Sequence, residues 1–509
     1  MVVPFPQTLD DAKAVILNLN DRVAELEKQV AWFKKQIFGR RSEKQSCFED
    51  LPGDQLNMFG AEATEEEARE EAEVPAPRKN TNTRRRRHLP ESAPRVDVVL
   101  DVPEEEKVCA CCGKQKERIG EDVTEQLDIV PAQVFVRRQI RPKYACSACR
   151  DGVVQTPLPE QPIKRGIAAP GFLAYMVLSK YADHIPLCRM EKIFARNDID
   201  ITRSNMSEWA MQLHRLCMPL IALILRRILT SAVIHSDDTT LRVQQPGGGI
   251  KRSYLWVYLG DESAPYTFYN FTEGRSRAGP NAILSEFSGF LQADAYTGYE
   301  ELYKLTSDDG SPQIIESGCW AHARRYFVQA DESGDARARH AIEEIAKLFA
   351  IEKQAKKECA EKTLNDLHTR RLELRRETSI AILENLFAWM DDRLDVLPQS
   401  PLGKAIGYAQ NNKTALYTYT TDGRLEIDNN AAERAMRPVA IGRKNWLFAG
   451  SNQGGQAAAT FFTLIESAKR NGLNPYDFLR DLFKRLPGHP INQIDDFLPG
   501  LWASPENKK

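Results

Sequence analysis

Apolar side chains recur with a seven-residue period at the start of the chain. Two heptad positions are filled in this way: Ile16, Val23, Val30 and Ile37 at one, and Leu19, Leu26 and Phe33 at the other. β-Branched residues at the first position with mostly leucine at the second favour a parallel two-stranded coiled coil. We therefore expect a coiled-coil helix over residues 1–45 that makes the protein a homo-oligomer. The alternative is one amphipathic helix that packs on its own chain.

The periodicity is lost in the segment that follows. An acidic block, Glu62–Glu73, is succeeded by prolines and by the basic run Arg84–Arg87. Charge blocks with few apolar residues are typical of solvated, low-complexity linkers. We expect a linker here, although the arginines also have the chemistry to touch phosphates.

Two pairs of cysteines with CxxC spacing come next. Cys109 and Cys112 form the first pair, and Cys146 and Cys149 form the second, with a strand-rich spacer between them. Structural zinc takes four ligands in a tetrahedron, and each CxxC turn offers two thiolates. The spacing predicts a zinc ribbon with a structural Zn²⁺, in which Cys111 can compete with Cys112. On the simplest interpretation the zinc only holds a small domain together.

Helical periodicity dominates the next segment. A helix over Leu187–Ala195, a turn at Asn197–Asp200 and a second helix that starts at Arg203, with Ser204 as its cap, predict a helix-turn-helix arrangement. In that motif the first residues of the second helix meet bases and phosphates. Arg203 and Asn205 are therefore candidate DNA-binding residues. The alternative is a helical hairpin inside a core.

Patterns typical of strands begin at Ser231. The expected elements are strands at Ala232–Ser236 (resumed at Leu241–Val243), Tyr254–Leu259 and Tyr266–Phe271, a helix at Asn281–Phe287, and a strand at Phe290–Ala293. Three antiparallel strands, a helix and another strand match the start of a ribonuclease-H-like fold. A long charged helical stretch, Asp335–Leu397, then separates the strands from a short helix at Asn430–Met436.

The chain is thus predicted to be a multidomain protein of mixed α+β and α/β class. The expected parts are a coiled-coil helix (1–45), a charged linker (46–95), a zinc ribbon (96–160), a helix-turn-helix-like DNA-binding region (161–228), a ribonuclease-H-like catalytic domain (229–450) with a helical insertion at about 335–398, and a helical C-terminal region (451–509). A chain of 509 residues is too long for one ordinary core, which agrees with several domains.

Composition narrows the class of protein. A hydrophobic content of 42% and a charged content of 28% fit a soluble globular protein, and a net charge of -2 means that any nucleic-acid binding must come from local patches. Asp10 and Asp11 interrupt any secretory signal. The longest apolar stretch, Leu216–Leu225, is shorter than the roughly 20 residues that span a bilayer. We expect a cytoplasmic protein without a membrane partner.

Three carboxylates are candidate catalytic residues. Asp237 and Asp294 each follow a predicted strand, and Glu433 starts a later helix. The first and fourth strands of a ribonuclease-H-like sheet are neighbours, so the two aspartates can converge. Mg²⁺ (or Mn²⁺) prefers carboxylate oxygens, and two such ions roughly 3.5–4 Å apart can carry out an in-line displacement at phosphorus. We therefore expect all three side chains to bind catalytic metal ions.

Each of these carboxylates also has a purely structural interpretation. Asp237 or its neighbour Asp238 can end a strand, and Asp294 can cap the turn that follows it. Glu433 lies three residues after Asn430, which is the spacing of a capping box.

Basic residues lie close in sequence to the carboxylates. The candidates for contact with DNA are His322, Arg324, Arg325, Arg437, Arg443 and Lys444. Such side chains would neutralise the DNA backbone, and Trp446 could stack on an unpaired base. The alternative is a solvated basic face.

Seven ordered segments resemble the transposases of the insertion sequence 66 family, along nearly the whole chain. They are Phe38–Lys44, the Cys109/Cys112 and Cys146/Cys149 pairs, Ser179–Pro186, Asp237–Thr239, Leu291–Tyr296, Gly318–His322 and Asp428–Arg434. The resemblance implies an Asp-Asp-Glu trio at Asp237, Asp294 and Glu433. It also implies an N-terminal half that binds the terminal repeats of the element, and accessory proteins as possible partners.

One segment departs from the family. The family usually has Asp-Glu-Thr where this chain has Asp237, Asp238 and Thr239, so either aspartate can be the metal ligand. If Glu433 only caps its helix, Asp428 is the first alternative for the third ligand.

The function expected is that of a DNA transposase in the bacterial cytoplasm or nucleoid. It would hydrolyse a phosphodiester at the element end and use the freed 3′-hydroxyl to attack target DNA. The alternatives are a DNA-binding regulator or decayed transposase without catalysis, and a nuclease that cuts but does not join. The intact carboxylate trio argues against decay.

The zinc ribbon gives the first testable prediction. Purified protein should contain about one zinc ion per chain by metal analysis, because one four-thiolate site holds one ion. Cys146→Ser should release it. Protein without zinc, or a Cys146→Ser variant that retains it, would contradict the ribbon.

Overall fold

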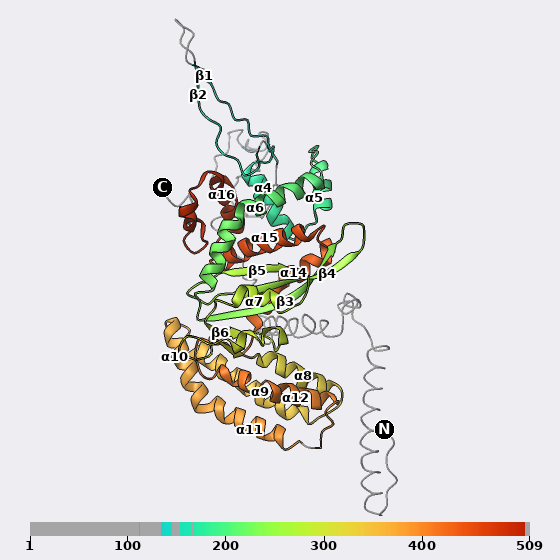
Figure 1. Cartoon of the computed structure of the whole chain (residues 1–509), viewed down its shortest axis with the longest axis vertical. Coiled ribbons are helices and arrows are strands. Elements are labelled where there is room, and N and C mark those ends of the chain that lie inside the picture. The colour runs from blue at the N-terminus through green and yellow to red at the C-terminus, as the bar shows by residue number, and fades with distance from the viewer. Residues whose placement is uncertain (1–110, 112–133, 145–152, 165, 394, 504–509) are drawn as a thin grey trace, which may run out of the picture. The chain divides into compact units, whose positions relative to one another are not determined.

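The computed structural model describes residues 111, 134–144, 153–164, 166–393 and 395–503 (Figure 1). The chain divides into two units, and the described residues from Arg141 onward belong to one of them. The heptad helix, the charged linker and the four cysteines of the predicted ribbon lie outside the described residues. Among the helices that are described, none is both long and apolar enough to cross a membrane.

A mixed five-stranded sheet forms the centre of this unit, with strand order β5-β4-β3-β6-β7. Its strands are β3 (Val233–Gln244), β4 (Ile250–Leu259), β5 (Thr267–Thr272), β6 (Gly289–Gln292) and β7 (Ile314–Ser317). β3 pairs antiparallel with β4, and β4 with β5, whereas β6 runs parallel to both β3 and β7. The expected strands and the contact between the first and fourth are confirmed, and the short strand β7 was not predicted.

β3 does not end at its two aspartates, and the prediction that it does was wrong. Asp237 and Asp238 lie in the middle of the strand, opposite Val257 and Trp256 of β4. The strand is buried from Val233 to Leu241, although six of these residues in a row are polar. The backbone of these polar residues is hydrogen-bonded to β4, so the strand continues through them. The prediction failed because a run of polar side chains looks in the sequence like the end of a strand.

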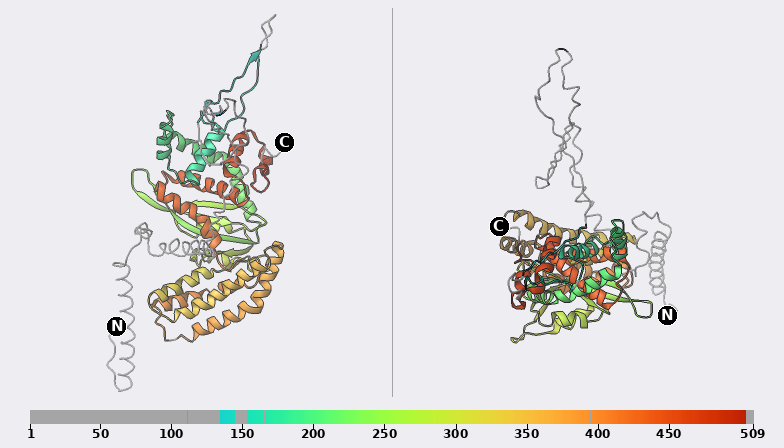
Figure 2. Two further views of the ribbon diagram at one scale, coloured as in Figure 1. Left: turned by 180° about the vertical axis from the view of Figure 1, so that it is seen from behind. Right: turned by 90° about the horizontal axis from the view of Figure 1, so that it is seen from above.

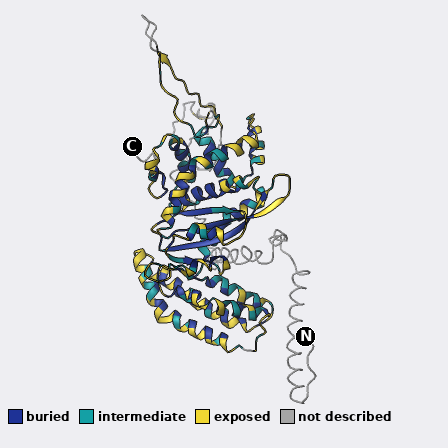
Figure 3. Ribbon diagram, in the orientation of Figure 1, coloured by how far each residue is buried: buried dark blue, intermediate teal, exposed yellow. Residues whose placement is uncertain are grey.

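Helices from both ends of this unit cover the sheet at β5. They are α4 (Pro170–Tyr181), α5 (Leu187–Ala195), α6 (Arg203–Ile228), α15 (Asn452–Arg470) and α16 (Pro475–Arg485). α15 runs along β5, where the Thr463 and Ser467 hydroxyls accept hydrogen bonds from backbone N–H groups of that strand at 2.9 and 3.0 Å. Figure 2 shows α14 and α15 lying across the sheet, and Figure 3 shows the sheet itself as mostly buried.

A bundle of helices packs at the β7 side of the sheet. It consists of α8 (Trp320–Glu332), α9 (Ala338–Glu358), α10 (Leu364–Leu374), α11 (Ile380–Asp391), α12 (Pro401–Asn411) and α13 (Lys413–Thr418), with a π-helical turn, Arg375–Ser379, between α10 and α11. Its apolar core includes Val233 of β3. Helical structure therefore continues beyond the expected insertion to Thr418.

The remaining elements are short apart from α14 (Asn430–Trp446), which is ten residues longer than the predicted helix. They are β1 (Lys143–Tyr144) and β2 (Val154–Gln155), which form an antiparallel pair, the helix α7 (Ala278–Leu284), and the 3₁₀ turns η2 (Thr297–Tyr299), η3 (Leu302–Lys304), η5 (Leu486–Gly488) and η6 (Ile491–Phe497). The predicted helices at the C-terminus are confirmed.

A buried arginine ties the bundle to the loop that precedes α14. Arg375 is 0% exposed, and its guanidinium makes two hydrogen bonds to the Glu352 carboxylate, at 2.7 and 2.8 Å. It also donates to the carbonyl oxygens of Tyr419, Asp422 and Leu425. A buried guanidinium is tolerated because its donors are used and its charge is paired.

Removing Glu352 should destabilise the protein. Glu352→Ala leaves Arg375 as an unpaired buried cation, and loss of one partner of a buried pair costs about 3–5 kcal/mol. We expect a clearly lower midpoint in thermal unfolding followed by circular dichroism. The control is Glu358→Ala, which removes an ion pair with Arg370 on the surface of the same helix and should change the midpoint little. Equal midpoints for the two variants would contradict this interpretation.

Candidate active site

Strand register brings Asp237 and Asp294 together. β6 runs parallel to β3, with His235 opposite Gln292. If this register is continued by two residues along both strands, Asp237 lies beside Asp294, which comes just after the end of β6. Residues in register on neighbouring strands project to the same face of a sheet. Two carboxylates therefore lie side by side where β6 ends next to the middle of β3.

Glu433 lies in the first turn of α14, close enough to Asp237 for its charge to raise the pKa of that aspartate. The start of this helix is fixed by Asn429, whose side-chain amide donates to the Ser236 carbonyl oxygen at 2.8 Å. The Asn429 side-chain oxygen also lies 3.1 Å from Nδ1 of His235, and both side chains are buried. Asn429 thus attaches α14 to the residues of β3 that immediately precede Asp237.

The structural interpretation of Glu433 as a capping residue was wrong. Asn429, not Asn430, precedes α14, and the helix has no side-chain cap. Asn430 instead donates to Asp428 through both its backbone and its side chain, at 3.0 and 2.9 Å. The carboxylate of Asp428, just before α14, is therefore used in hydrogen bonds from Asn430. Glu433 is the carboxylate in the first turn of α14 whose charge acts on Asp237 of β3.

The carboxylates are buried, and they also repel one another electrostatically. Burial raises the pKa of Asp237 well above its usual range, and the charges of Asp294, Asp238 and Glu433 add to the shift. Burial and the charge of Asp238 raise the pKa of Asp294 to about 6, although Arg275 and the Tyr296 N–H oppose them. Because it accepts a hydrogen bond from this N–H, Asp294 also stabilises the turn after β6. Such mutual repulsion is typical of a site that holds a cation.

Unpaired oxygens point to the same chemistry. Asp237 is 6% exposed, and its Oδ2 atom has no hydrogen-bond partner among the described residues, nor do Asp238 Oδ2 and Glu433 Oε1. Carboxylate oxygens without donors fit a hard divalent cation. The three side chains are not already in coordination geometry, since no group of three or more His, Cys, Asp or Glu in the described part of the chain is set to hold a metal ion.

Asp238 is a buried carboxylate with its own counter-ion. Its Oδ1 atom accepts hydrogen bonds from Nε and Nη2 of Arg275, at 3.1 and 2.8 Å. The same guanidinium lies over the Tyr296 ring, 4.1 Å from its centre. Burial raises the pKa of Asp238 and Arg275 lowers it. Of the two adjacent aspartates, Asp238 is therefore paired with an arginine, whereas Asp237 is not.

Two of the basic residues predicted on α8 lie against Glu433. Arg325 Nη2 and His322 Nδ1 are each 3.6 Å from Glu433 Oε1. Burial and the charge of Arg325 lower the pKa of His322 to about 3, so its ring is neutral at pH 7 and the contact is not an ion pair. Arg325 is thus the positive charge beside Glu433. Arg324 also has an interaction partner.

Arg443, on the last turn of α14, is used inside the protein. Its Nη1 atom donates at 2.8 Å to three oxygens of β3, which belong to Thr239 and Thr240. Burial lowers its pKa, and the charge of Arg242 lowers it further. Arg437 and Lys444 also have interaction partners. The basic face predicted here is therefore partly a set of contacts that hold α14 on the sheet.

The residues predicted to recognise DNA on α6 are exposed. Arg203 and Asn205 lie in the first turn of this helix, after the turn that follows α5. Thr202 caps the helix by accepting from the Asn205 N–H at 3.3 Å, so the prediction of Ser204 as the cap was wrong by two residues. Thr202 suits the cap position because its backbone is extended, so that its hydroxyl can accept from the unpaired N–H groups in the first turn of α6.

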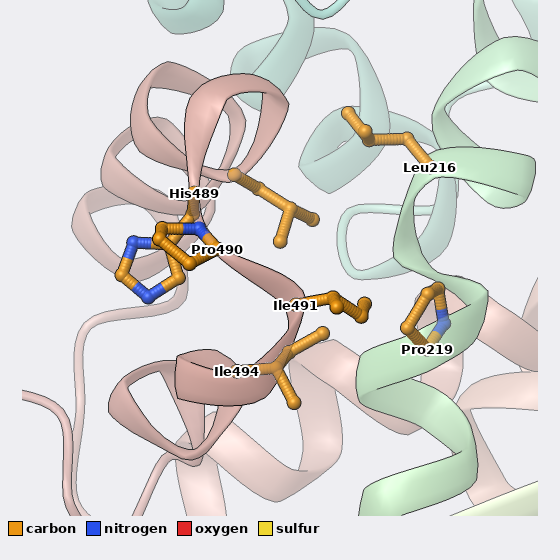
Figure 4. A pocket seen from close by; sticks show the side chains of 7 residues that line it. Leu216, Pro219, His489, Pro490, Ile491 and Ile494 are labelled. Atoms are coloured by element: carbon orange, nitrogen blue, oxygen red, sulfur yellow. The ribbon is translucent and has the colours of Figure 1, made fainter.

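An apolar pocket elsewhere is unrelated to the carboxylates (Figure 4). It lies between α6 and the C-terminal turns η5 and η6, and its lining residues are Leu216, Pro219, Leu486, His489, Pro490, Ile491 and Ile494. It contains no acidic side chain, so it offers none of the chemistry of the carboxylate site.

Comparison with known sequences identifies the family. Residues 165–457 match the family described as Transposase IS66 family, and residues 463–499 match the IS66 C-terminal element. Residues 106–150 match the zinc-finger binding domain of transposase IS66, and residues 25–98 match Transposase C of IS166 homeodomain. The chain belongs to the IS66 family of transposases.

Relatives of similar length occur in Sinorhizobium fredii. The proteins named uncharacterized protein y4jD and uncharacterized protein y4qI are 34% and 36% identical to this IS66-family chain over 501 and 508 residues. Each alignment covers 96% of this chain, and they cover 96% and 90% of the two relatives. The similarity thus extends over the whole length and is not confined to one domain.

Sequence reasoning missed two residues of the site in this IS66-family chain. Arg275 lies in a loop after β5, and no local pattern connects it with Asp238, which is 37 residues away. Asn429 does lie in the motif Asp428–Arg434, where the doubled asparagine was a usable signal. Side chains that act by holding a catalytic element become visible only when the packing is known.

The raised pKa of Asp294 predicts a pH-dependent cost in stability. An ordinary aspartate in an unfolded chain titrates near 3.9, so folding favours the protonated form of Asp294, and the cost of its charge grows as pH rises from about 4 through about 6. In chelator at pH 7.5, Asp294→Asn should therefore unfold at a higher temperature than the unsubstituted protein, and this gain should vanish near pH 4. A shift of about two units corresponds to roughly 3 kcal/mol at most.

The matched control is Asp309→Asn. Hydrogen bonds from Ser311 lower the pKa of Asp309, so its neutralisation should give no gain in stability. If Asp294→Asn gives no gain at pH 7.5, or a gain that is larger at pH 4, the site does not carry the repulsion described above.

Proposed function

We propose that this chain is a DNA transposase that cleaves the ends of its insertion sequence and transfers the strands by metal-dependent phosphoryl transfer. The observation that carries the proposal is the convergence of Asp237, Asp294 and Glu433. These carboxylates come from β3, from the end of β6 and from α14, they repel one another, and two of them keep buried oxygens without donors. Membership of the IS66 family supports the same activity.

The catalytic domain is proposed to have a ribonuclease-H-like fold. The support is the topology of the sheet: three antiparallel strands, then two strands parallel to the first. In such a sheet an acid on the first strand and an acid after the fourth are neighbours. The bundle α8–α13 is then an insertion between the last strand and the helix that carries the glutamate.

Asp237, Asp294 and Glu433 would hold Mg²⁺ or Mn²⁺. Two such ions would supply activation of the attacking oxygen and stabilisation of the leaving oxygen. The donor set fits these hard ions, because all its members are carboxylate oxygens and because Asp237 has no counter-ion of its own among the described residues. Asp238 is left out of this proposed set because its Oδ1 atom is paired with Arg275.

The neighbouring side chains have distinct roles in this proposal. Arg325 orients the Glu433 carboxylate and offsets part of its charge. The neutral His322 ring can hold or pass a proton beside Glu433 but adds no positive charge for a phosphate. Asn429 positions α14 and hence Glu433.

The N-terminal part of the chain is proposed to select the DNA. The zinc ribbon with Cys109, Cys112, Cys146 and Cys149 and the helix pair α5–α6 with Arg203 and Asn205 would bind the terminal repeats. The heptad helix would join two copies of the chain. The zinc-finger family match at residues 106–150 supports the ribbon, and the exposure of the first turn of α6 supports the role of that helix.

Neutral substitutions of the trio test the catalytic proposal. Asp237→Asn, Asp294→Asn and Glu433→Gln should each reduce cleavage of a labelled element end in Mg²⁺ or Mn²⁺. The expected loss is on the order of 10²–10³-fold or more, the scale on which an essential charge-stabilising group acts. Binding of the same DNA in a gel-shift assay should persist, because it is assigned to the N-terminal part.

Asp428→Asn and Asp238→Asn are the matched controls. Asp428 is engaged by Asn430, and Asp238 by Arg275, so both variants should retain much more cleavage than the trio variants. If Asp428→Asn is inactive while Glu433→Gln cleaves, the third ligand has been assigned to the wrong residue. If Asp238→Asn is inactive while Asp237→Asn cleaves, the wrong residue of β3 has been chosen.

A further inference from the structure

The outer halves of β3 and β4 extend as a hairpin beyond the other strands. β6 pairs with β3 only from Val233 to His235, and β5 reaches no further along β4 than Tyr254. The outer hairpin, defined here as residues 240–254, is visible as the arm at the end of β4 in Figure 1. It ends in a turn with three consecutive glycines of positive φ, Gly247 to Gly249, so the tip is held by backbone geometry and not by packing.

Two arginines face each other across this hairpin. Arg242 is the direct cross-strand partner of Arg252, and both side chains are exposed. Like charges directly opposite destabilise a strand pair. Among the residues that the structure describes, neither arginine has an acidic partner. The next residue, Lys251, differs in this respect, since its Nζ atom lies 2.7 Å from Glu273.

A third guanidinium adds to the repulsion. Arg443, at the end of α14, is close enough to Arg242 for that charge to lower its pKa, after the larger effect of burial. Its Nη1 atom is used by the threonines of β3, as described above. The two exposed guanidinium groups of the hairpin, with the charge of Arg443 nearby, suit an anion from outside the chain.

Exposed apolar side chains lie beside these arginines. After α14 the chain turns at Leu447, which has a φ of 59°, an uncommon conformation for a residue other than glycine. Ala449 then pairs with β3, donating to the Arg242 carbonyl oxygen at 2.8 Å and accepting from the Gln244 N–H at 2.9 Å. This pairing sets Phe448, which is 37% exposed, next to Arg242, while Leu447 is 59% exposed.

Trp446, the aromatic residue singled out from the sequence, is not part of this surface. Its indole packs on its own helix, so closely that a Cβ atom added at Gly442 would lie 2.9 Å from Nε1. The aromatic group available to a ligand is therefore Phe448.

We propose that the outer hairpin holds the sugar–phosphate backbone of a DNA duplex through Arg242 and Arg252, with Phe448 and Leu447 against the groove. This inference rests on the proposed function, since it assigns a second DNA contact to the same catalytic domain. Planar guanidinium groups suit phosphate oxygens, and apolar side chains between basic ones suit the sugar and base edges.

The geometry also sets where on the DNA this contact falls. Arg242 lies five residues beyond Asp237 on one strand, which at about 3.4 Å per residue is about 17 Å. A duplex rises by about 3.4 Å per base pair, so the hairpin would contact phosphates about five base pairs from the bond that is cut. Contacts at this distance hold the duplex in register without touching the reacting atoms.

Salt dependence of DNA binding tests the hairpin. The full-length chain is titrated with a fluorescein-labelled duplex of mixed sequence and about 30 base pairs, in Ca²⁺, from about 50 to about 200 mM KCl. The double variant Arg242→Gln/Arg252→Gln should reduce the slope of log K against log salt by about 2, because each lost phosphate contact removes about 0.9. Lys251→Gln is the matched control and should leave the slope unchanged, since its charge is already neutralised by Glu273.

A photo-crosslinker gives a second measurement that does not depend on affinity. Benzoylphenylalanine in place of Phe448 should crosslink to the duplex in the chain with both arginines and lose the crosslink in the double variant. An unchanged slope in the double variant overturns the proposal, and so does a crosslink that survives it. A loss of slope that Lys251→Gln reproduces also overturns it, because bulk charge would then be the cause.

The outcome is separable from that of the catalytic proposal. Binding is measured in Ca²⁺, where no cleavage is required. A chain that binds through the hairpin yet never cleaves would refute the catalytic assignment alone. A chain that cleaves and shows no change in slope in the double variant would refute the hairpin alone.

Discussion

The burial of two adjacent carboxylates in a central strand is the constraint on which the rest of this structure depends. Ionised groups are costly to remove from water unless they are paired or coordinated. Asp238 is paired, because Arg275 reaches back from the loop after β5 and stacks on Tyr296. Asp237 has no such partner and instead faces two further carboxylates. One strand thus carries, side by side, an acid that is paired with an arginine and one that is not, and under the proposed function the second would hold the metal ion.

A site built from repelling charges has to be held together by contacts elsewhere. The segment before α14 is fixed at several points: Gln292 donates to the Glu426 carbonyl oxygen, the Trp320 N–H donates to that of Ile427, and Asn429 joins β3. Upstream of it, Arg375 gathers three carbonyl oxygens of the loop 419–425 into the bundle. The helical bundle therefore does more than fill an insertion. The buried ion pair between Arg375 and Glu352 fixes the path of the segment that leads to α14 and Glu433.

The sequence predicted the elements well where periodicity was clear and failed where burial overrode it. The strands β4, β5 and β6, the helices before β3 and the adjacency of the first and fourth strands followed from apolar patterning. The continuity of β3 did not, because a run of polar residues in a central strand has the pattern of a loop until its tertiary partners are known. The positions of the three carboxylates could be predicted from chain order and family resemblance. The roles of Arg275 and Asn429 could not, since they act through contacts between residues far apart in sequence. Trp446, a residue expected to stack on a base, packs its indole against Gly442, which its place in the sequence did not indicate.

The distribution of charge explains how an acidic site and a polyanionic substrate can be compatible. With a net charge of -2, the chain as a whole gives no attraction to DNA. The carboxylates alone would repel a phosphate, and burial strengthens that repulsion because the local dielectric is low. The fixed cations lie around the carboxylates and not among them: Arg275 pairs with Asp238, Arg325 lies beside Glu433, and Arg242 and Arg252 lie further out on the hairpin. Under the proposed function the centre would be left for mobile divalent cations, whose binding would reverse the sign of the site. Approach of DNA would then require the metal, and the repulsion that costs stability in the free protein would also keep the site from holding a phosphate before it can react.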